Sequence, residues 1–395
     1  MNQTTSKKIA NAVSTIIDRV RRNGDAALAL FLKKFDKVSI QPKKFRISAS
    51  EVTAALKQID PQTKSAITDC ASRIKTFHQN ERKNIQKSWK RNQDGVTLGQ
   101  IIRPVESVGI YVPGGRFSYP STVLMAAIPA KIAGVKKIVL VTPPQNLTDE
   151  LLASAEIAGV DEIFQIGGPA AVAALAIGTR NIPKVDLIVG PGNAYVTEAK
   201  RQLYGEVGID LLAGPSELVI LADKSAKADF IAADLAAQAE HDPMASSTLI
   251  STDRKLPGNV KALLPQTKLG QCKFVFEPDL KKALFRLNQL AGEHVEILVK
   301  NPQKILGEIK NGGAIFIGPY SPAVMGDYWA GPSHVLPTGR SARFSSGLSV
   351  ANFLKRSSLI QVSPAAFARG GKSAYKMAVI EGLMQHANSI KIRLK

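Results

Sequence analysis

Four of the five histidines in this 395-residue chain stand beside polar partners, and the pattern repeats through its second half. The groups are Glu240-His241-Asp242, Glu293-His294, Ser333-His334, and Glu381 followed five residues later by His386. The fifth histidine, His78, lies in a basic segment without such company. A single histidine beside a carboxylate is usually an ordinary core or surface residue, but imidazole also titrates near neutral pH and ligates metals. The repetition therefore indicates a functional site.

An alanine-rich run over residues 232–241 predicts a helix that ends before Pro243, and its last turn is unusually polar. Gln238 and His241 are three residues apart, so they project from one face of this helix. Two side chains that converge in this way suit a divalent metal. The carboxylate and imidazole types of Asp327, His334 and His386 suit zinc in particular, although spacing does not choose among them. The alternative is that Gln238 and His241 only cap the helix end.

The elements that must position these side chains are short β-rich runs separated by alanine-rich helical segments. This alternation predicts an α/β fold with largely parallel sheets that are covered on both faces. The runs are residues 107–112, 136–142, 161–166, 185–190, 217–223, 247–252, 294–299 and 314–318.

Two segments, YVPGGRFSYP from Tyr111 and IVGPGNAYV from Ile188, run from a strand through a Pro/Gly turn into a helix. Each turn offers backbone N–H groups to an anion at a helix N-terminus. The second contains Gly190 and Gly192, but Tyr195 occupies the third position of a dinucleotide fingerprint. A tight turn between strand and helix is therefore the favoured interpretation of the motif alone.

Composition describes an ordinary globular chain with room for two or more domains: 45% of the residues are hydrophobic. The net charge of +20 comes from the ends, since residues 1–100 carry 20 Lys and Arg against 8 Asp and Glu, and residues 346–395 carry 8 against 1. With one aromatic, Trp89, in the basic stretch 78–93, a solvated surface is favoured over nucleic-acid binding. No signal peptide or membrane span is expected, and Cys70 and Cys272 form no framework, which favours the cytoplasm.

Eight blocks between about Asp94 and Leu394 resemble the histidinol dehydrogenase family, in the family's order. They are YVPGG, YPSTVLMAAIPAKIAGVKKIVLVTPP, IVGPGNAYVTEAKRQL, AGPSELVILAD, QAEHDP, GEHVEI, GDYWAGPSHVLPTGRSARFSSGLSV and EGLMQHANSI. The resemblance implies two incomplete Rossmann-like units with parallel sheets and a C-terminal helical arm exchanged in a homodimer. We expect one unit over 111–216, a second that joins 1–110 to 217–347, and the arm over 348–395.

The resemblance also implies the chemistry: zinc-dependent, four-electron oxidation of L-histidinol through L-histidinal to L-histidine by two NAD. The implied zinc ligands, which also contact the substrate, are Gln238, His241, Asp327 and, from the partner subunit's arm, the residue equivalent to His386. The implied substrate pocket further contains Ser216, His294, His334 and Glu381. The acid/base pair would be Glu293 and His294, and NAD would contact Tyr111 and Asn193.

The chain departs from the family pattern near the expected NAD site. Ala170 stands where the family usually has a glutamine that helps to hold NAD, and Arg116 and Phe117 differ from common versions of their turn. Two other functions remain as alternatives. One is a related NAD-dependent dehydrogenase that acts on a different amino or hydroxy compound, and the other is a non-enzymatic binder of polyanions.

Overall fold

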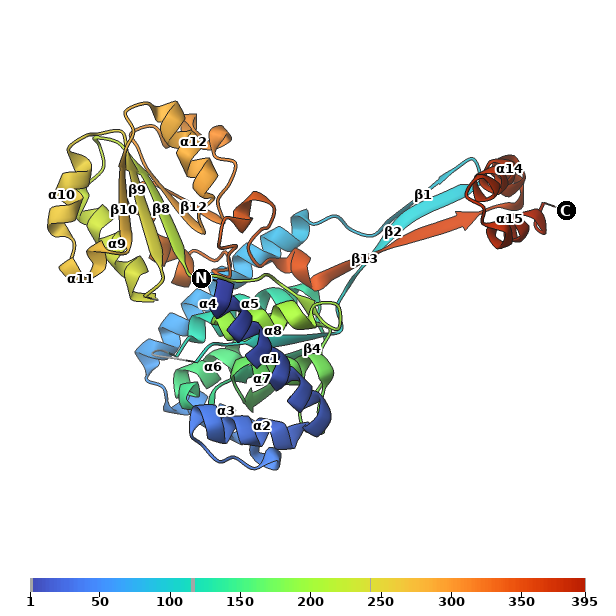
Figure 1. Cartoon of the computed structure of the whole chain (residues 1–395), viewed down its shortest axis with the longest axis horizontal. Helices are drawn as coiled ribbons and strands as arrows, with labels where there is room; N and C mark the ends of the chain where they lie inside the picture. The colour runs from blue at the N-terminus through green and yellow to red at the C-terminus, as the bar shows by residue number, and fades with distance from the viewer. Residues whose placement is uncertain (1–2, 115–117, 242, 395) are drawn as a thin grey trace. The chain divides into compact units, whose positions relative to one another are not determined.

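A computed structural model describes residues 3–114, 118–241 and 243–394 of the chain (Figure 1). The chain divides into two compact units. The larger comprises Met1–Lys83 and Val105–Phe353, and the smaller comprises Asn84–Pro104 and Leu354–Lys395. Among the described residues, no helix combines the length and the apolar character needed to cross a bilayer.

The first sheet of the larger unit has five parallel strands in the order β5-β4-β3-β6-β7. Its central strands are almost wholly buried, which is why they consist of continuous apolar runs. The bounds are β3 Ser107–Tyr111, β4 Lys137–Thr142, β5 Glu162–Gln165, β6 Leu187–Val189 and β7 Gly208–Ile209. The connecting helices are α5 Pro120–Ala133, α6 Asp149–Ala158, α7 Gly168–Ile177 and α8 Ala194–Leu203.

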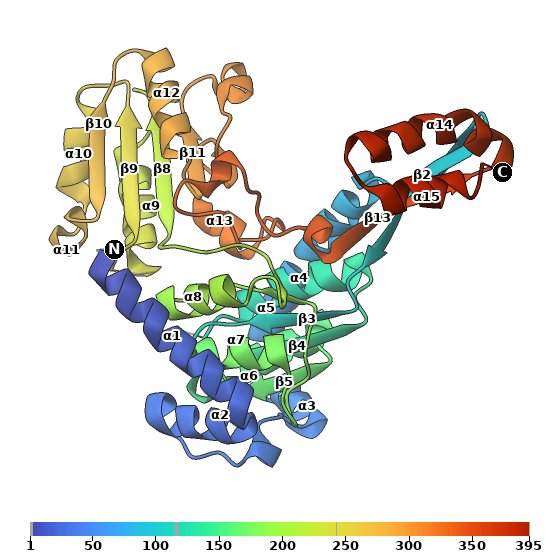
Figure 2. The same cartoon turned by 45° about the vertical axis from the view of Figure 1, so that its right-hand side comes forward.

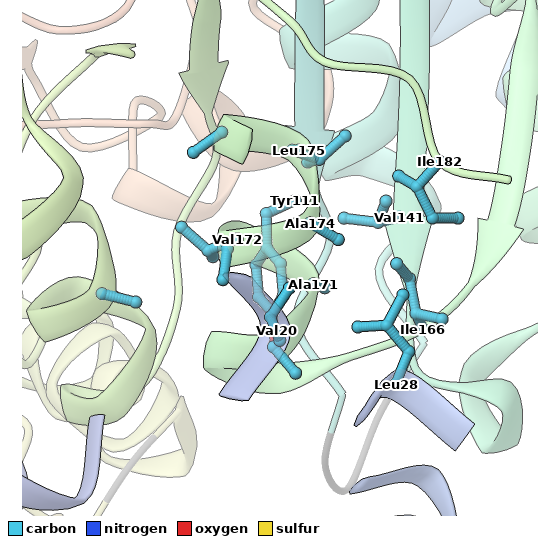
Figure 3. Packing of buried hydrophobic residues seen from close by; sticks show 14 of the residues in the cluster. Val20, Leu28, Tyr111, Val141, Ile166, Ala171, Val172, Ala174, Leu175 and Ile182 are labelled. Atoms are coloured by element: carbon cyan, nitrogen blue, oxygen red, sulfur yellow. The ribbon is translucent and has the colours of Figure 1, made fainter. Parts of the chain in front are cut away.

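The N-terminal helices cover this first sheet. The amphipathic helix α1 (Gln3–Asn23) packs against α7 and α8, and α3 (Ala49–Gln58) packs against α6. The buried face of α1 shares one core with the strands, and Figure 3 shows Val20 beside Ala171 and Tyr111. This packing differs from the expectation that residues 1–110 join residues 217–347. The apolar spacing of α1 says which face is buried, but it does not say which sheet buries that face.

The second sheet of the larger unit is also parallel, with the strand order β10-β9-β8-β11-β12 (Figure 2). Alternate side chains of β8 enter different cores: Leu218 packs in the core that contains Ile231 of α9, and Val219 packs in the core that contains Leu284 of α12. The bounds are β8 Glu217–Ala222, β9 Ser246–Ser251, β10 Cys272–Phe276, β11 His294–Leu298 and β12 Ala314–Ile317. Its helices are α9 Ala228–His241, α10 Leu256–Leu263, α11 Gln266–Leu269, α12 Leu280–Leu290 and α13 Ala323–Tyr328.

The predicted α/β fold with parallel sheets is thus confirmed. Every β-rich run identified in the sequence forms a strand of one of the two sheets. The remaining helices that begin in the larger unit are α2 Asp25–Phe31 and α4 Pro61–Asn84. Short helical turns occupy Leu32–Asp36, Pro42–Lys44, Pro144–Asn146, Pro302–Lys304, Leu306–Glu308, Ser341–Arg343 and Val350–Phe353.

The smaller unit is an antiparallel sheet with two helices. Strand β2 (Val96–Pro104) pairs with β1 (Trp89–Gln93) on one side and with β13 (Leu354–Val362) on the other. Helices α14 (Pro364–Ile380) and α15 (Met384–Lys391) follow and pack against each other. The C-terminal segment therefore begins with a strand, where the sequence suggested only helices. Its largely polar composition, LKRSSLIQV, suits an exposed antiparallel strand.

Candidate functional site

A cavity of about 400 Å³, hereafter the central cavity, brings together most of the side chains singled out in the larger unit. It lies beyond the carboxyl ends of β3 and β6 in the first sheet, where open parallel sheets usually bind ligands. From the second sheet it receives the residues around the starts of β8 and β11. Its lining includes Thr122, Asn193, Ser216, Glu293, His294, Asp327 and His334.

His294 lies between two carboxyl groups in this cavity. Its side chain is only 6% exposed, its Nδ1 lies 3.8 Å from Glu293 Oε2, and its Nε2 lies 3.5 Å from Asp327 Oδ1. Burial alone would lower the pKa of His294, but the nearby carboxylates of Asp327 and Glu293 outweigh it and raise the pKa to about 9. The imidazole is therefore held ready to carry a proton between two carboxyl groups.

Glu293 precedes β11 and is likewise buried. Its Oε2 accepts the backbone N–H of Glu217 at 3.0 Å, which fixes the carboxyl group at the start of β8. Burial raises the pKa of Glu293 to about 7, although the neighbouring His294 charge acts in the opposite direction. A carboxyl group with this pKa can both release and accept a proton at neutral pH.

His334 is oriented by two hydrogen bonds. Its Nδ1 lies 3.0 Å from the backbone carbonyl oxygen of Asp327, and its Nε2 lies 3.1 Å from Thr122 Oγ1. Because a carbonyl oxygen only accepts, Nδ1 carries the proton, and in the neutral ring Nε2 accepts from the threonine hydroxyl. Sequence reasoning missed Thr122, which is 212 residues from His334 and carries no local signal.

Gln238 lies on α9 with its side chain buried, and its Nε2 has no hydrogen-bond partner among the described residues. It lines a small cavity together with Asp327. His241 is the last residue of α9, but its side chain and all of Asp242 fall outside what the structure describes. Glu381, which caps α14, and His386, in α15, belong to the smaller unit.

The residues that could hold a metal are chemically suited to zinc. Gln238 offers an amide oxygen, Asp327 a carboxylate, and His241 and His386 imidazoles, all of them oxygen or nitrogen ligands that zinc accepts. Gln238 Nε2 is buried without a hydrogen-bond partner, and turning the amide by 180° would place its oxygen, the atom that ligates a cation, at this position. Within the described part of the chain, no three His, Cys, Asp or Glu side chains by themselves form a metal-binding group.

A second cavity, of about 660 Å³, lies beside the first sheet. Tyr111 lines it, and its buried hydroxyl accepts the backbone N–H of Gly168 at 3.2 Å, while burial raises the pKa of this tyrosine to about 12. Asn193 lines both cavities and caps α8 by accepting the N–H groups of Tyr195 and Val196 at 3.0 and 3.2 Å. The methyl group of Ala170 also faces this cavity. Arg116 and Phe117 lie outside the described residues.

A buried ion pair fixes the turn between the two cavities, residues 190–193. Lys200 Nζ donates to the Gly190 carbonyl at 2.7 Å and to Asp210 Oδ1 at 2.5 Å, and Asp210 Oδ2 accepts the Gly190 N–H at 2.7 Å. Both side chains are at most 2% exposed. Gly190 has φ +111, and a Cβ there would lie 2.2 Å from the Tyr111 carbonyl oxygen, so only glycine fits the turn.

Comparison with known proteins decides the family. Residues 1–394 match the family model described as histidinol dehydrogenase. The chain belongs to the histidinol dehydrogenase family. It is 44% identical over 406 residues to a histidinol dehydrogenase of Listeria innocua, covering 99% of this chain and 94% of the relative. With one from Bacillus cereus it shares 44% identity over 402 residues, or 98% and 93% of the two chains.

A solved structure of the same family supports the fold. The crystal structure of histidinol dehydrogenase from Elizabethkingia anophelis matches with a TM-score of 0.90 and 33% identity, covering 100% of this chain and 96% of that chain. The resemblance drawn from the eight sequence blocks is thus confirmed. Membership of the histidinol dehydrogenase family makes the chain an enzyme of the oxidoreductase class, with a part in histidine biosynthesis.

Proposed function

We propose that this chain oxidises L-histidinol through L-histidinal to L-histidine, with zinc as its metal and two NAD as electron acceptors. The observation that carries the proposal is the triad of buried Glu293, buried His294 and partly exposed Asp327 in the central cavity, within a chain of the histidinol dehydrogenase family. Two hydride transfers must each be accompanied by movement of a proton. The triad supplies two adjacent groups with pKa values that suit this task.

In the first oxidation, the carbinol carbon gives a hydride to NAD and its hydroxyl gives up a proton. His294 accepts this proton, for which the imidazole must be neutral. The Asp327 carboxylate supports the protonated ring, so engaging Asp327 with a cation lowers the pKa of His294 toward neutrality. The metal site and the proton acceptor are thereby coupled through one carboxylate.

In the second oxidation, the aldehyde adds water before another hydride can leave. Glu293 accepts the proton of this water, and its pKa of about 7 allows it to pass the proton on before the next cycle. When bound, zinc would orient the substrate amine and imidazole and polarise the reacting oxygen. Gln238, His241 and Asp327 would hold it from one subunit. His334 and Ser216 line the same cavity and would contact the substrate.

The second cavity is our proposed NAD site. It is bounded by Tyr111, Gly168 and Asn193, and Asn193 also reaches the central cavity, so the nicotinamide could approach the carbinol from that side. Ala170 contributes only a methyl group there. Gln145 lines the same cavity and donates to Asp36 at 3.2 Å. It offers this cavity the same side-chain amide that the family usually places at position 170.

We further propose that the smaller unit is exchanged in a homodimer, so that Glu381 and His386 complete the partner's site. Several large apolar side chains of this unit are exposed, which favours an interface that covers them. They are Leu98, Ile360, Val362, Met377, Ile380, Leu383 and Met384. Mixed dimers of a His241→Ala chain and a His386→Ala chain should recover activity in one of their two sites. Mixed dimers without any activity would contradict the exchange.

Variants of the acid/base pair test the proposed chemistry. His294→Asn should slow both oxidations, because no group remains to take the hydroxyl proton. Glu293→Gln should slow the oxidation of L-histidinal far more than that of L-histidinol, by about 10²- to 10⁴-fold. Single-turnover NADH formation from each substrate separates the two steps. Equal loss of both steps in Glu293→Gln would contradict the assignment, and turnover of another amino alcohol in place of histidinol would favour the alternative dehydrogenase.

A further inference from the structure

Glu296 is a buried carboxyl group that the chemistry above does not use. It is the third residue of β11 and is 1% exposed. Since side chains alternate along a strand, Glu296 projects from the same face of β11 as His294. A carboxyl group rarely occupies such a position without a specific set of partners.

The hydrogen-bond partner of Glu296 belongs to α13, the helix that carries Asp327. Glu296 Oε1 accepts the backbone N–H of Ala323 at 2.8 Å. Ala323 is the first residue of α13, and Asp327 follows four residues, or about one turn, later. The N–H groups of a first helical turn have no partner within the helix, so the Glu296 carboxyl fixes where α13 begins.

The nearest carboxyl neighbour of Glu296 on α9 is Asp234, which lines the same small cavity, and Glu296 Oε2 is buried there with no hydrogen-bond partner among the described residues. Gln238 lies four residues further along α9, on the same face of the helix. Two carboxyl groups can share a hydrogen bond only when one of them holds a proton. Burial raises the pKa of both groups, which is consistent with a shared proton at neutral pH.

Glu296 therefore lies where the three elements that present His294, Gln238 and Asp327 meet. Asp234, Gln238, Glu296 and Asp327 line one small cavity. We propose that Glu296 and Asp234 are positioning residues for the proposed zinc site: they tie α9 to α13 one helical turn before Gln238 and Asp327, and set the separation of these two ligands. The inference rests on the proposed zinc site and adds to it two residues that do not ligate the metal.

A purely structural role would be served equally well by apolar side chains. Replacing a buried polar pair by well-packed apolar residues is often neutral or stabilising. A leucine at position 296 would fill the space, but it would leave the Ala323 N–H without an acceptor and α13 without its tie to α9. Glutamine would keep the contact with Ala323 through its carbonyl oxygen, and its amide N–H would donate to an ionised Asp234.

Zinc affinity of the full-length protein is the test, measured by competition with a chromogenic chelator. We expect Glu296→Leu to weaken zinc binding by about 10- to 100-fold, the usual effect of removing a group that orients metal ligands. Glu296→Gln should bind zinc nearly as tightly as the wild type. The absorption spectrum of the cobalt-substituted protein should change in Glu296→Leu and not in Glu296→Gln. Asp234→Leu, at a half-buried position that is easier to tolerate, should weaken zinc in the same direction.

Leu264→Ala is the matched control. Leu264 is buried in the same core as Leu235 of α9, but it does not line the small cavity of Asp234 and Glu296. It should lower the melting temperature and leave zinc affinity unchanged. Wild-type affinity in Glu296→Leu or Asp234→Leu would overturn the inference, as would a Glu296→Gln variant as weak as Glu296→Leu. A wild-type protein that binds no zinc would instead refute the proposed function itself.

Discussion

The buried pair of Lys200 and Asp210 allows a quantitative prediction for Lys200→Met. Both side chains lie almost wholly out of solvent, and together they hold the N–H and the C=O of Gly190. Methionine fills much of the lysine volume but leaves the Asp210 carboxylate buried without its cation. Breaking one side of such a pair costs about 3 to 5 kcal/mol. A typical domain has a free energy of unfolding of about 5 to 15 kcal/mol, so the loss is large.

The matched control is Lys131→Met. Lys131 pairs with Asp161 at 3.1 Å, but these side chains are 36% and 38% exposed. Ion pairs at exposed positions contribute about 0 to 1 kcal/mol, so the same chemical change there should have little effect. Denaturant unfolding at a fixed subunit concentration measures both variants. Lys200→Met also removes the hydrogen bond from Lys200 Nζ to the Gly190 carbonyl, which helps to hold the turn over residues 190–193. Because Asn193 of this turn lines the proposed NAD site, KM for NAD should rise in the fraction of the variant that folds.

Equal losses of unfolding free energy in Lys200→Met and Lys131→Met would refute the reasoning. So would a Lys200→Met variant that is strongly destabilised while its KM for NAD stays at the wild-type value. The first result would mean that the buried carboxylate finds another partner. The second would mean that the turn keeps its shape without the ion pair.

Two further predictions concern the same region and the acid/base pair. Gly190→Ala should destabilise the protein far more than Gly205→Ala. Both glycines have positive φ, but a Cβ at position 190 would lie 2.2 Å from a backbone oxygen, whereas position 205 has open space. Thermal unfolding compares the two variants, and equal losses of stability would contradict the steric argument. In the chelated protein, the folded-state pKa of Glu293 is about 7 and that of His294 about 9, both above the ordinary values. The folded chain therefore binds more protons than the unfolded chain, and its stability should fall as the pH rises from about 5 to about 9. Unfolding midpoints across this range test the sign, and a rising midpoint would contradict it.

Local patterns in the sequence predicted eight of the ten strands of the two parallel sheets and missed β7, which has two residues, and the partly exposed β10. VDLIVG forms β6 and KKIVLVT forms β4, because buried parallel strands need nearly continuous apolar runs. The antiparallel strands were missed, since β1 is exposed at every residue and carries no alternating apolar pattern. Strand order and the sheet that receives α1 depend on contacts between distant segments, which no local pattern encodes.

The candidate site was likewise predicted only in part from the sequence. The adjacent pair of Glu293 and His294 stands out in the sequence, and the structure places both beside Asp327 in one cavity. Thr122 could not be predicted, because it meets His334 only through the fold. Glu296 was also missed, since in sequence it is one acidic residue within a buried strand, and the residues around it come from two other elements.

The most direct test of the central claim is NADH formation from L-histidinol by the purified full-length chain, before chelation, after chelation and after zinc is restored. The account predicts turnover that disappears with the metal, returns with zinc, and yields two NADH for each L-histidinol converted to L-histidine. Turnover that is indifferent to chelation, or that stops at one NADH for each L-histidinol, would contradict it.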